Sequence, residues 1–331
     1  MRPRIFVTQP VANTALVRLR KHADVTVNPQ AGRIIAKKTL VAAVRRCDLL
    51  FSLLHDRIDR DVIAANPRLR VIASQSITPD NIDVAEATRR NIPVTVVPAI
   101  VAEATADIAF GLMLMAARRM VEGDRLVHKG RFPGSQSSYL LGAAVYGKTI
   151  GLIGGGGRIG SAVARRARGF DMRVLYWGPR RKSDSFERQF QMTYAPLDRL
   201  LQESDFVSVH SPLKPETHHQ IGSRELALMK PTAFLINTAR GAVVDEAALT
   251  RALKQGRIAG AGLDVFEHEP KVAPGLLAMS NVVATPHLGS AVAEVREQMA
   301  NIVVDNILAL LAGKPPPNCI NPEVLAACRA H

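Results

Sequence analysis

The chain has 331 residues, of which 47% are hydrophobic and 22% charged, so its composition is that of an ordinary globular protein with about two domains. Its 43 Lys and Arg residues outnumber 29 Asp and Glu residues and give a formal charge of +14. This charge favours small carboxylates and phosphates as partners, whereas the scattered basic residues and few aromatic residues argue against nucleic-acid binding as the main role.

The longest apolar run, 108–117, is too short to span a membrane, so we expect no membrane association and a cytoplasmic location. The cysteines, Cys47, Cys319 and Cys328, lack CxxC spacing. They indicate neither a disulfide scaffold nor a zinc site, and we expect no metal.

The first part of the chain alternates short apolar runs with helical patterns. Strands are predicted at 4–7, 48–51, 70–73 and 93–97, and a helix at 39–46. This alternation predicts a parallel sheet covered by helices. A proline-free helical pattern then extends from 101 to about 129, and it predicts one long helix between two blocks. The Ser- and Gly-rich segment 134–147 is expected to be an irregular loop.

A second alternation begins at Lys148. Its strand candidates are 149–153, 173–176, 206–209, 233–236, 260–264 and 281–284, which fit one doubly wound dinucleotide-binding sheet. A helix is expected at 291–312, followed by a stiff tail at 315–317. The expected fold class is α/β, with two Rossmann-like doubly wound parallel-sheet domains and an interdomain cleft. The substrate-binding domain is discontinuous, 1–99 and 289–331, and the dinucleotide-binding domain is 100–288.

Four consecutive glycines follow the strand at 149–153, and a helical pattern follows them. The pattern GxGxxG fits at Gly155, Gly157 and Gly160. In such a loop the first glycine allows a tight turn, the second lets the backbone approach a pyrophosphate, and the third allows close packing of helix on strand. The helix N-terminus, with Arg158 and Ile159, would face the anion.

The end of the next strand selects the cofactor. An NAD-binding sheet carries a carboxylate there for the ribose 2′-hydroxyl. This chain has Trp177 and Gly178, then Pro179 and three cations that include Arg180 and Arg181. A guanidinium suits a 2′-phosphate, so we expect NADP(H) to be preferred, with NAD(H) as the alternative.

Three further stretches place polar groups at or after predicted strands: 236–241 with Arg240, 262–270 with Glu269, and 285–290 with His287. Carboxyl ends of parallel strands share one edge of a sheet, so these groups are expected to converge beside the cofactor.

Together with the glycine loop, these stretches resemble the D-isomer-specific 2-hydroxyacid dehydrogenase family over nearly the whole chain. The basic strand end is similar to the glyoxylate/hydroxypyruvate reductase branch. The resemblance implies reduction of a small 2-oxo acid to the D-2-hydroxy acid by NADPH. Arg240 would hold the substrate carboxylate, His287 would act as general acid, and Glu269 would orient its ring. The resemblance also implies a homodimer formed through the long helix and the loop 130–147.

Further contacts are implied by the resemblance. Asp264 would bind the nicotinamide carboxamide. Other cofactor contacts are expected at His210, Ser211, Pro212, Thr217, Thr238, Ala239 and Gly289. The substrate pocket is expected around Leu54, Ser76 and Ile77, with Arg240 and His287. His218 and His219 lie in a polar loop, where we expect solvated side chains and not metal ligands.

The sequence departs from the family pattern at two places. The glycine stretch holds one residue more than the family pattern, so the sequence does not decide which glycine faces the pyrophosphate. Ile77 and Thr78 replace a Val-Gly pair in the substrate loop, and Pro79 has no N–H to donate.

Two other interpretations remain open. A non-enzymatic dinucleotide sensor or corepressor would use the same fold, although it has no need of a proton donor. A phosphoglycerate, phosphite or formate-type dehydrogenase would also share the architecture.

Overall fold

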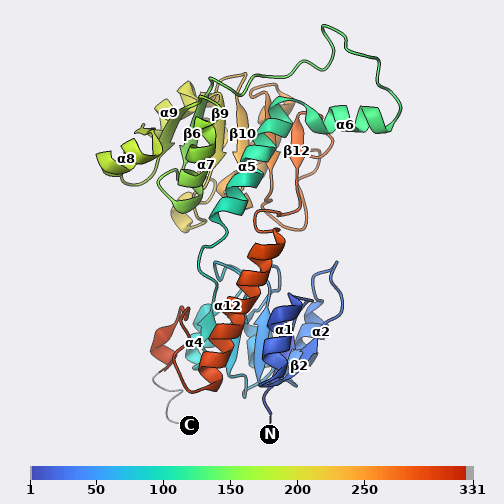
Figure 1. Cartoon of the computed structure of the whole chain (residues 1–331), viewed down its shortest axis with the longest axis vertical. Helices are drawn as coiled ribbons and strands as arrows, with labels where there is room; N and C mark the ends of the chain where they lie inside the picture. Colours follow the sequence, from blue (N-terminus) through green and yellow to red (C-terminus); the bar gives the residue numbers. More distant parts are fainter. Residues whose placement is uncertain (1, 326–331) are drawn as a thin grey trace. The chain divides into compact units, whose positions relative to one another are not determined.

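The computed structural model describes residues 2–325, so Cys328 lies outside the described part. The chain forms two compact units (Figure 1). Unit 1 contains the residues up to Ile100 and those from Val292 onward, and unit 2 contains Val101–Ala291. The divisions expected from the sequence lie after residues 99 and 288. Each unit has its own parallel sheet between layers of helices, which confirms the predicted α/β class.

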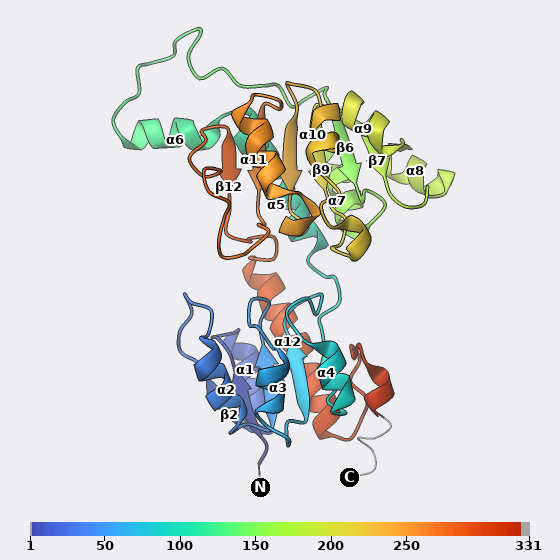
Figure 2. The same ribbon diagram turned by 180° about the vertical axis from the view of Figure 1, so that it is seen from behind.

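Unit 1 has a five-stranded parallel sheet in the order β2-β1-β3-β4-β5. Its strands are β1 (Arg4–Val7), β2 (Asp24–Val27), β3 (Leu49–Ser52), β4 (Val71–Ser74) and β5 (Val94–Thr95). Helices α1 (Asn13–Arg20) and α12 (Ala293–Leu311) lie over one face (Figure 1). Helices α2 (Lys37–Val44), α3 (Arg60–Ala64) and α4 (Val84–Arg89) lie over the other (Figure 2). Every residue of the inner strands β3 and β4 is buried, which explains their continuous apolar sequence.

The edges of this sheet differ from the expectation. Strand β2 was not predicted, because this edge strand alternates exposed and half-buried residues and has no apolar run. The segment after α12, expected as a stiff tail, pairs with the opposite edge: Val96 N–H donates to the Asn318 carbonyl (3.2 Å) and Ile320 N–H to the Val94 carbonyl (2.9 Å). The tail therefore covers strand β5, which would otherwise expose unpaired backbone groups. The 3-10 turn η3 (Pro322–Val324) follows it.

Unit 2 has a seven-stranded parallel sheet in the order β12-β11-β10-β9-β6-β7-β8. The strands are β6 (Thr149–Ile153), β7 (Arg173–Trp177), β8 (Met192–Tyr194), β9 (Phe206–Val209), β10 (Phe234–Asn237), β11 (Gly260–Leu263) and β12 (Val282–Ala284). The order reverses between β6 and β9. In open α/β sheets, ligands bind at the carboxyl ends of the strands at this switch point.

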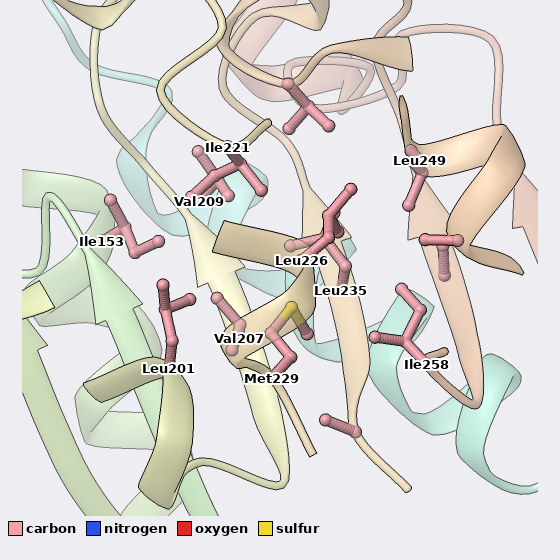
Figure 3. Packing of buried hydrophobic residues seen from close by; sticks show 14 of the residues in the cluster. Ile153, Leu201, Val207, Val209, Ile221, Leu226, Met229, Leu235, Leu249 and Ile258 are labelled. Carbon is pink, nitrogen blue, oxygen red and sulfur yellow. The ribbon is translucent and has the colours of Figure 1, made fainter. Parts of the chain in front are cut away.

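Helices cover both faces of this sheet. Helices α5 (Ala102–Ala117) and α7 (Arg158–Arg168) lie over one face, with α8 (Asp184–Phe190) beside α7 (Figure 1). Helices α9 (Leu197–Glu203), α10 (Ser223–Leu228) and α11 (Glu246–Lys254) lie over the other (Figure 2). Figure 3 shows the core on that side, where Val207 and Leu235 of the strands pack near Leu226 and Leu249 of the helices. Two 3-10 turns complete the unit, η1 (Pro215–Thr217) and η2 (Gly241–Val243).

The prediction of one long helix from 101 to 129 is wrong. Helix α5 ends at Ala117, Arg119 adopts a left-handed conformation (φ 52°), and α6 (Met120–His128) begins after it. The last carbonyl of α5 is taken by a distant residue, since Ala143 N–H donates to the Ala117 carbonyl at 2.8 Å. This tertiary contact ends the helix where local propensity would continue it. Among residues 2–325, no helix is long and apolar enough to cross a bilayer.

Candidate active site

The tight turn after β6 is made by Gly154. Its φ is 81°, and its N–H donates to the Trp177 carbonyl at 2.8 Å. A Cβ on Gly154 would stand 2.8 Å from the backbone of His210 and Ser211 at the end of β9, so only glycine fits there. The spacing of GxGxxG predicts this turn at Gly155, and the additional glycine moves it by one residue.

The other loop glycines bring α7 close to the sheet. A Cβ on Gly160 would stand 2.5 Å from Gly155 Cα, so this helix packs directly on the loop. Gly157 is the N-cap of α7, and Arg158 and Ile159 form its first turn. The first turn of α7 therefore stands at the glycine loop, where the positive end of the helix dipole would face a phosphate.

Two buried polar atoms at the same sheet edge have no partner within the described residues. They are His210 Nδ1, after β9, and Thr238 Oγ1, after β10. Buried polar atoms in proteins are nearly always hydrogen-bonded. Together with the glycine loop, these atoms fit a nicotinamide dinucleotide bound across the carboxyl ends of β6, β9 and β10.

Burial lowers the pKa of His210 to about 4, whereas an unfolded histidine titrates near 6.5. The folded ring is therefore neutral over an interval in which the unfolded chain binds a proton. We expect this residue to lower the free energy of unfolding as pH falls from 6.5 to 4, by up to about 3 kcal/mol.

Proton NMR tests this directly, with the His210 signals assigned by comparison with His210→Asn. The ring protons should keep their chemical shifts from pH 8 to pH 5. A titration centred above pH 6 would contradict the prediction.

Three other predicted cofactor residues, Ser211, Pro212 and Thr217, lie in the loop after β9. Thr217 Oγ1 accepts from Lys214 N–H (2.8 Å) and donates to the Pro212 carbonyl (2.6 Å), so its hydroxyl closes its own loop. Ser211 is buried beside Gly154, whereas Pro212 is exposed. Of this loop, the structure thus brings Ser211 to the glycine turn and uses Thr217 elsewhere.

The three cations in the turn after β7 differ in their contacts. Arg181 pairs with Glu187 (2.8 Å) and Asp184 (3.2 Å), and this guanidinium holds the pKa of Glu187 below its usual range. Arg180 is exposed, and within the described chain no partner bonds its side chain. The Lys182 side chain lies over Gly156, whose added Cβ would stand 2.6 Å from Lys182 Cε.

Lys182 was not among the predicted cofactor residues, although it is the third cation of the run. The carbonyl of the strand residue Trp177 accepts a hydrogen bond from Gly154 N–H, and Gly178, the next residue, is buried. Of the three cations, Arg180 and Lys182 are therefore the ones available to an anion near the glycine loop.

His287 and Glu269 form a hydrogen-bonded pair. His287 Nδ1 lies 2.9 Å from Glu269 Oε2, and both side chains are about four-fifths buried. The other carboxylate oxygen accepts from Phe266 N–H at 2.9 Å. His287 has a left-handed backbone (φ 56°), and its N–H donates to the Asp264 carbonyl at 2.9 Å. The carboxylate is fixed at one oxygen and holds the imidazole with the other.

Asp264 supports the loop that carries His287. Its carboxylate is 1% exposed and accepts from Thr285 Oγ1 (2.7 Å), Leu288 N–H (2.6 Å) and Gly289 N–H (2.7 Å). The family resemblance implies that this carboxylate binds the nicotinamide carboxamide. In the structure both of its oxygens are used to hold the histidine loop.

Arg240 lies in the turn after β10. The side chain of Asn237 closes this turn, since its Nδ2 donates to the Arg240 carbonyl (3.1 Å) and its Oδ1 accepts from Ala239 N–H (3.0 Å). Gly241 packs so closely against the backbone of 266–267 that a Cβ would overlap it. The Arg240 turn is thus pressed against the loop that carries Glu269.

Glu246, the first residue of α11, was not singled out from the sequence. Its carboxylate accepts from Glu267 N–H (2.9 Å) and Ala273 N–H (2.7 Å), so it holds both sides of the Glu269 loop. A glutamate in the first turn of a helix is expected for the helix dipole alone, so no sequence signal distinguished this second role.

The predicted substrate residues of unit 1 follow its inner strands. Ser76 comes after β4 and is buried; its Oγ lies 2.7 Å from Ser74 Oγ and donates to the Thr78 carbonyl at 2.7 Å. Leu54, after β3, and Ile77 are half-buried. The Ser76 hydroxyl therefore shapes its own loop.

Comparison with known proteins agrees with this geometry. Residues 110–289 match the NAD binding domain of the D-isomer specific 2-hydroxyacid dehydrogenases. A glyoxylate reductase of Korarchaeum cryptofilum is 48% identical over 328 residues, 98% of each chain.

Two solved structures are similar over nearly their whole lengths. A protein of Thermus thermophilus has a TM-score of 0.87 and 42% identity, over 96% of this chain and 99% of its own. An NADPH-dependent glyoxylate/hydroxypyruvate reductase of Sinorhizobium meliloti, solved with NADP and malonate, has a TM-score of 0.81 and 31% identity over 97% of both chains.

The chain belongs to the D-isomer specific 2-hydroxyacid dehydrogenase family. Within that family it lies in the glyoxylate reductase branch, and it is a 2-hydroxyacid dehydrogenase enzyme. The resemblance found in the sequence is confirmed. Its cofactor is a nicotinamide dinucleotide.

Proposed function

We propose that this enzyme reduces glyoxylate or hydroxypyruvate to the corresponding 2-hydroxy acid with NADPH, giving the D product where a stereocentre forms. The observation that carries this proposal is the hydrogen-bonded pair of His287 and Glu269 beside the Arg240 turn. These groups follow strands of the sheet whose switch point carries the glycine loop. Relatives named glyoxylate reductase support the substrate class.

Each proposed catalytic group has a defined task. When bound, the reduced nicotinamide supplies a hydride to the carbonyl carbon. Arg240 binds the substrate carboxylate through its guanidinium and polarises the adjacent keto oxygen. Glu269 accepts from Nδ1 of His287, so the transferable proton is on Nε2, which gives it to the carbonyl oxygen as the C=O bond becomes C–OH. Asp264 holds the loop that positions this ring.

Steady-state rates test the proposed function. The untagged enzyme is assayed with glyoxylate, hydroxypyruvate, pyruvate and 3-phosphohydroxypyruvate, each with NADPH and with NADH. The highest kcat/KM should be found for glyoxylate or hydroxypyruvate with NADPH. Turnover that requires a phosphorylated 2-oxo acid, or that is faster with NADH, would contradict the proposal.

We place the 2′-phosphate at Arg180 and Lys182, since Arg181 is paired with Glu187. The double variant Arg180→Gln/Lys182→Gln should raise KM for NADPH about 10–100-fold, because a hydrogen bond to a charged group contributes about 1.5–3 kcal/mol. KM for NADH should change little.

Arg181→Gln is the matched control. It removes the same charge from the same turn but should leave the ratio of the two KM values unchanged, because its partner is Glu187. A loss of NADPH preference in this variant alone would show that the wrong cations had been assigned.

We also propose a homodimer formed through α6 and the loop 130–147. This part of the surface exposes six large apolar side chains: Met120, Val127, Phe132, Tyr139, Leu141 and Tyr146. So many exposed large apolar side chains within one segment favour a protein interface there. Helix α5, which was expected to take part, is instead mostly buried within unit 2.

Light scattering after size exclusion tests the dimer. The native chain should have the mass of two chains, and Phe132→Ser/Leu141→Ser should shift it to one. Leu277→Ser, which replaces an equally exposed leucine elsewhere on unit 2, should remain dimeric. A monomeric native chain at assay concentrations would contradict the proposal.

A further inference from the structure

Two adjacent histidines and a glutamate, none of them a proposed catalytic group, lie together in unit 2. The rings of His218 and His219 are stacked, with centroids 4.0 Å apart and an interplanar angle of 29°. His219 Nε2 lies 2.8 Å from Glu267 Oε1. One ligand atom from each of the three residues lies within 4.8 Å of the other two. His219 is half-buried and bonded, so the expectation that both side chains are solvated is wrong for this residue.

The backbone holds two of these ligands in place. His219 has a left-handed conformation (φ 52°), and its N–H donates to the Ala242 carbonyl at 2.8 Å. Glu267 N–H donates to the buried carboxylate of Glu246 at 2.9 Å. A cation would therefore meet a largely preformed pair, and only His218, which is exposed, would need to adjust.

The stacking of His218 is the feature that a simple His–Glu pair leaves unexplained. The bond between His219 and Glu267 needs no second imidazole, and two protonated rings in face-to-face contact would repel each other. Two neutral imidazoles and one carboxylate are instead the donor set of many zinc sites.

The distances suit a tetrahedral ion. With bonds of about 2.0–2.1 Å, neighbouring ligand atoms in such a site are about 3.3 Å apart. On binding, the distance of 2.8 Å between His219 Nε2 and Glu267 Oε1 would increase slightly. The ligand atom of His218, which lies within 4.8 Å of the other two, would move closer to them by rotation of its side chain. The exposed side of His218 leaves the fourth position to water.

We propose that His218, His219 and Glu267 form a binding site for a divalent transition-metal ion of the zinc type. The ion would bridge the loop after η1 to the loop 266–270. It takes no part in the proposed hydride and proton transfer, because its ligands are separate from Arg240, Glu269 and His287.

Calorimetric titration with ZnCl₂ tests the site, using the untagged full chain after treatment with a chelator. The native chain should bind Zn²⁺ with one site per chain. Substitution with Co²⁺ should give the intense visible bands of four-coordinate cobalt. His218→Gln and His219→Asn should each weaken binding at least about tenfold, and asparagine tolerates the left-handed backbone at 219.

Two controls make the result specific. His22→Gln removes an exposed histidine from unit 1, and His287→Asn removes the proposed proton donor; both should bind Zn²⁺ as the native chain does. Equal affinity of the native chain and the His218→Gln and His219→Asn variants would overturn the proposal, as would octahedral Co²⁺ spectra. Because binding is read without turnover, it can fail or succeed independently of the proposed reductase activity.

Discussion

Replacing His287 by asparagine should lower kcat by about 10²–10⁴-fold, because the proton for the developing alkoxide would then come from water. Asparagine tolerates the left-handed conformation of this residue, so the loop should keep its shape. His287→Ala should give a similar loss with some added backbone strain. Steady-state rates with NADPH and the preferred 2-oxo acid measure the effect.

Cofactor binding separates this chemical role from a structural one. The dissociation constant of NADPH, measured by fluorescence, should be nearly unchanged in His287→Asn. His268→Gln is the matched control, since this exposed histidine lies in the neighbouring loop beside Glu269, and it should have normal rates. Near-normal turnover of His287→Asn would exclude the residue as the proton donor.

Replacing Arg240 by glutamine should raise KM for the 2-oxo acid about 10–100-fold, since a hydrogen bond to a charged group contributes about 1.5–3 kcal/mol. It should also lower kcat by up to about 10²–10³-fold, the usual cost of removing a donor that stabilises a developing oxyanion. The KM for NADPH should remain unchanged.

Arg251→Gln is a suitable control, because this exposed arginine of α11 carries the same charge in the same unit. It should leave all three parameters unchanged. If Arg240→Gln altered only the KM for NADPH, the guanidinium would belong to the cofactor and the proposed carboxylate site would be wrong.

The order of strands and helices could be predicted from the sequence, because buried parallel strands are short apolar runs bounded by polar segments. Strands β6 and β9 match their predicted bounds. The missed strands β2 and β8 lie at sheet edges. Strand β2 alternates exposed and half-buried residues, and β8 has only three residues, of which one is buried, so neither has an apolar run. Local pattern therefore finds every inner strand, but of the four edge strands it finds only β5 and β12.

Several features of the site depend on contacts between residues distant in the sequence, which a local pattern does not reveal. The tight turn after β6 is made by Gly154 because the backbone of His210, after β9, approaches it closely. The spacing of GxGxxG alone predicts Gly155, one residue later. The pairing of Arg181 with Glu187 depends on how α8 follows the turn. The use of Asp264 in the histidine loop depends on strands β11 and β12 lying side by side.

The groups proposed to handle the carboxylate and the proton all belong to residues 101–291, together with Asp264 and Glu246, which hold their loops. Leu54, Ser76 and Ile77 belong to the other unit. With the substrate pocket predicted around these residues, mutations near Ser76 would change substrate preference during evolution without disturbing the bond between His287 and Glu269. A chain built in this way can acquire a new substrate while retaining an older reaction chemistry.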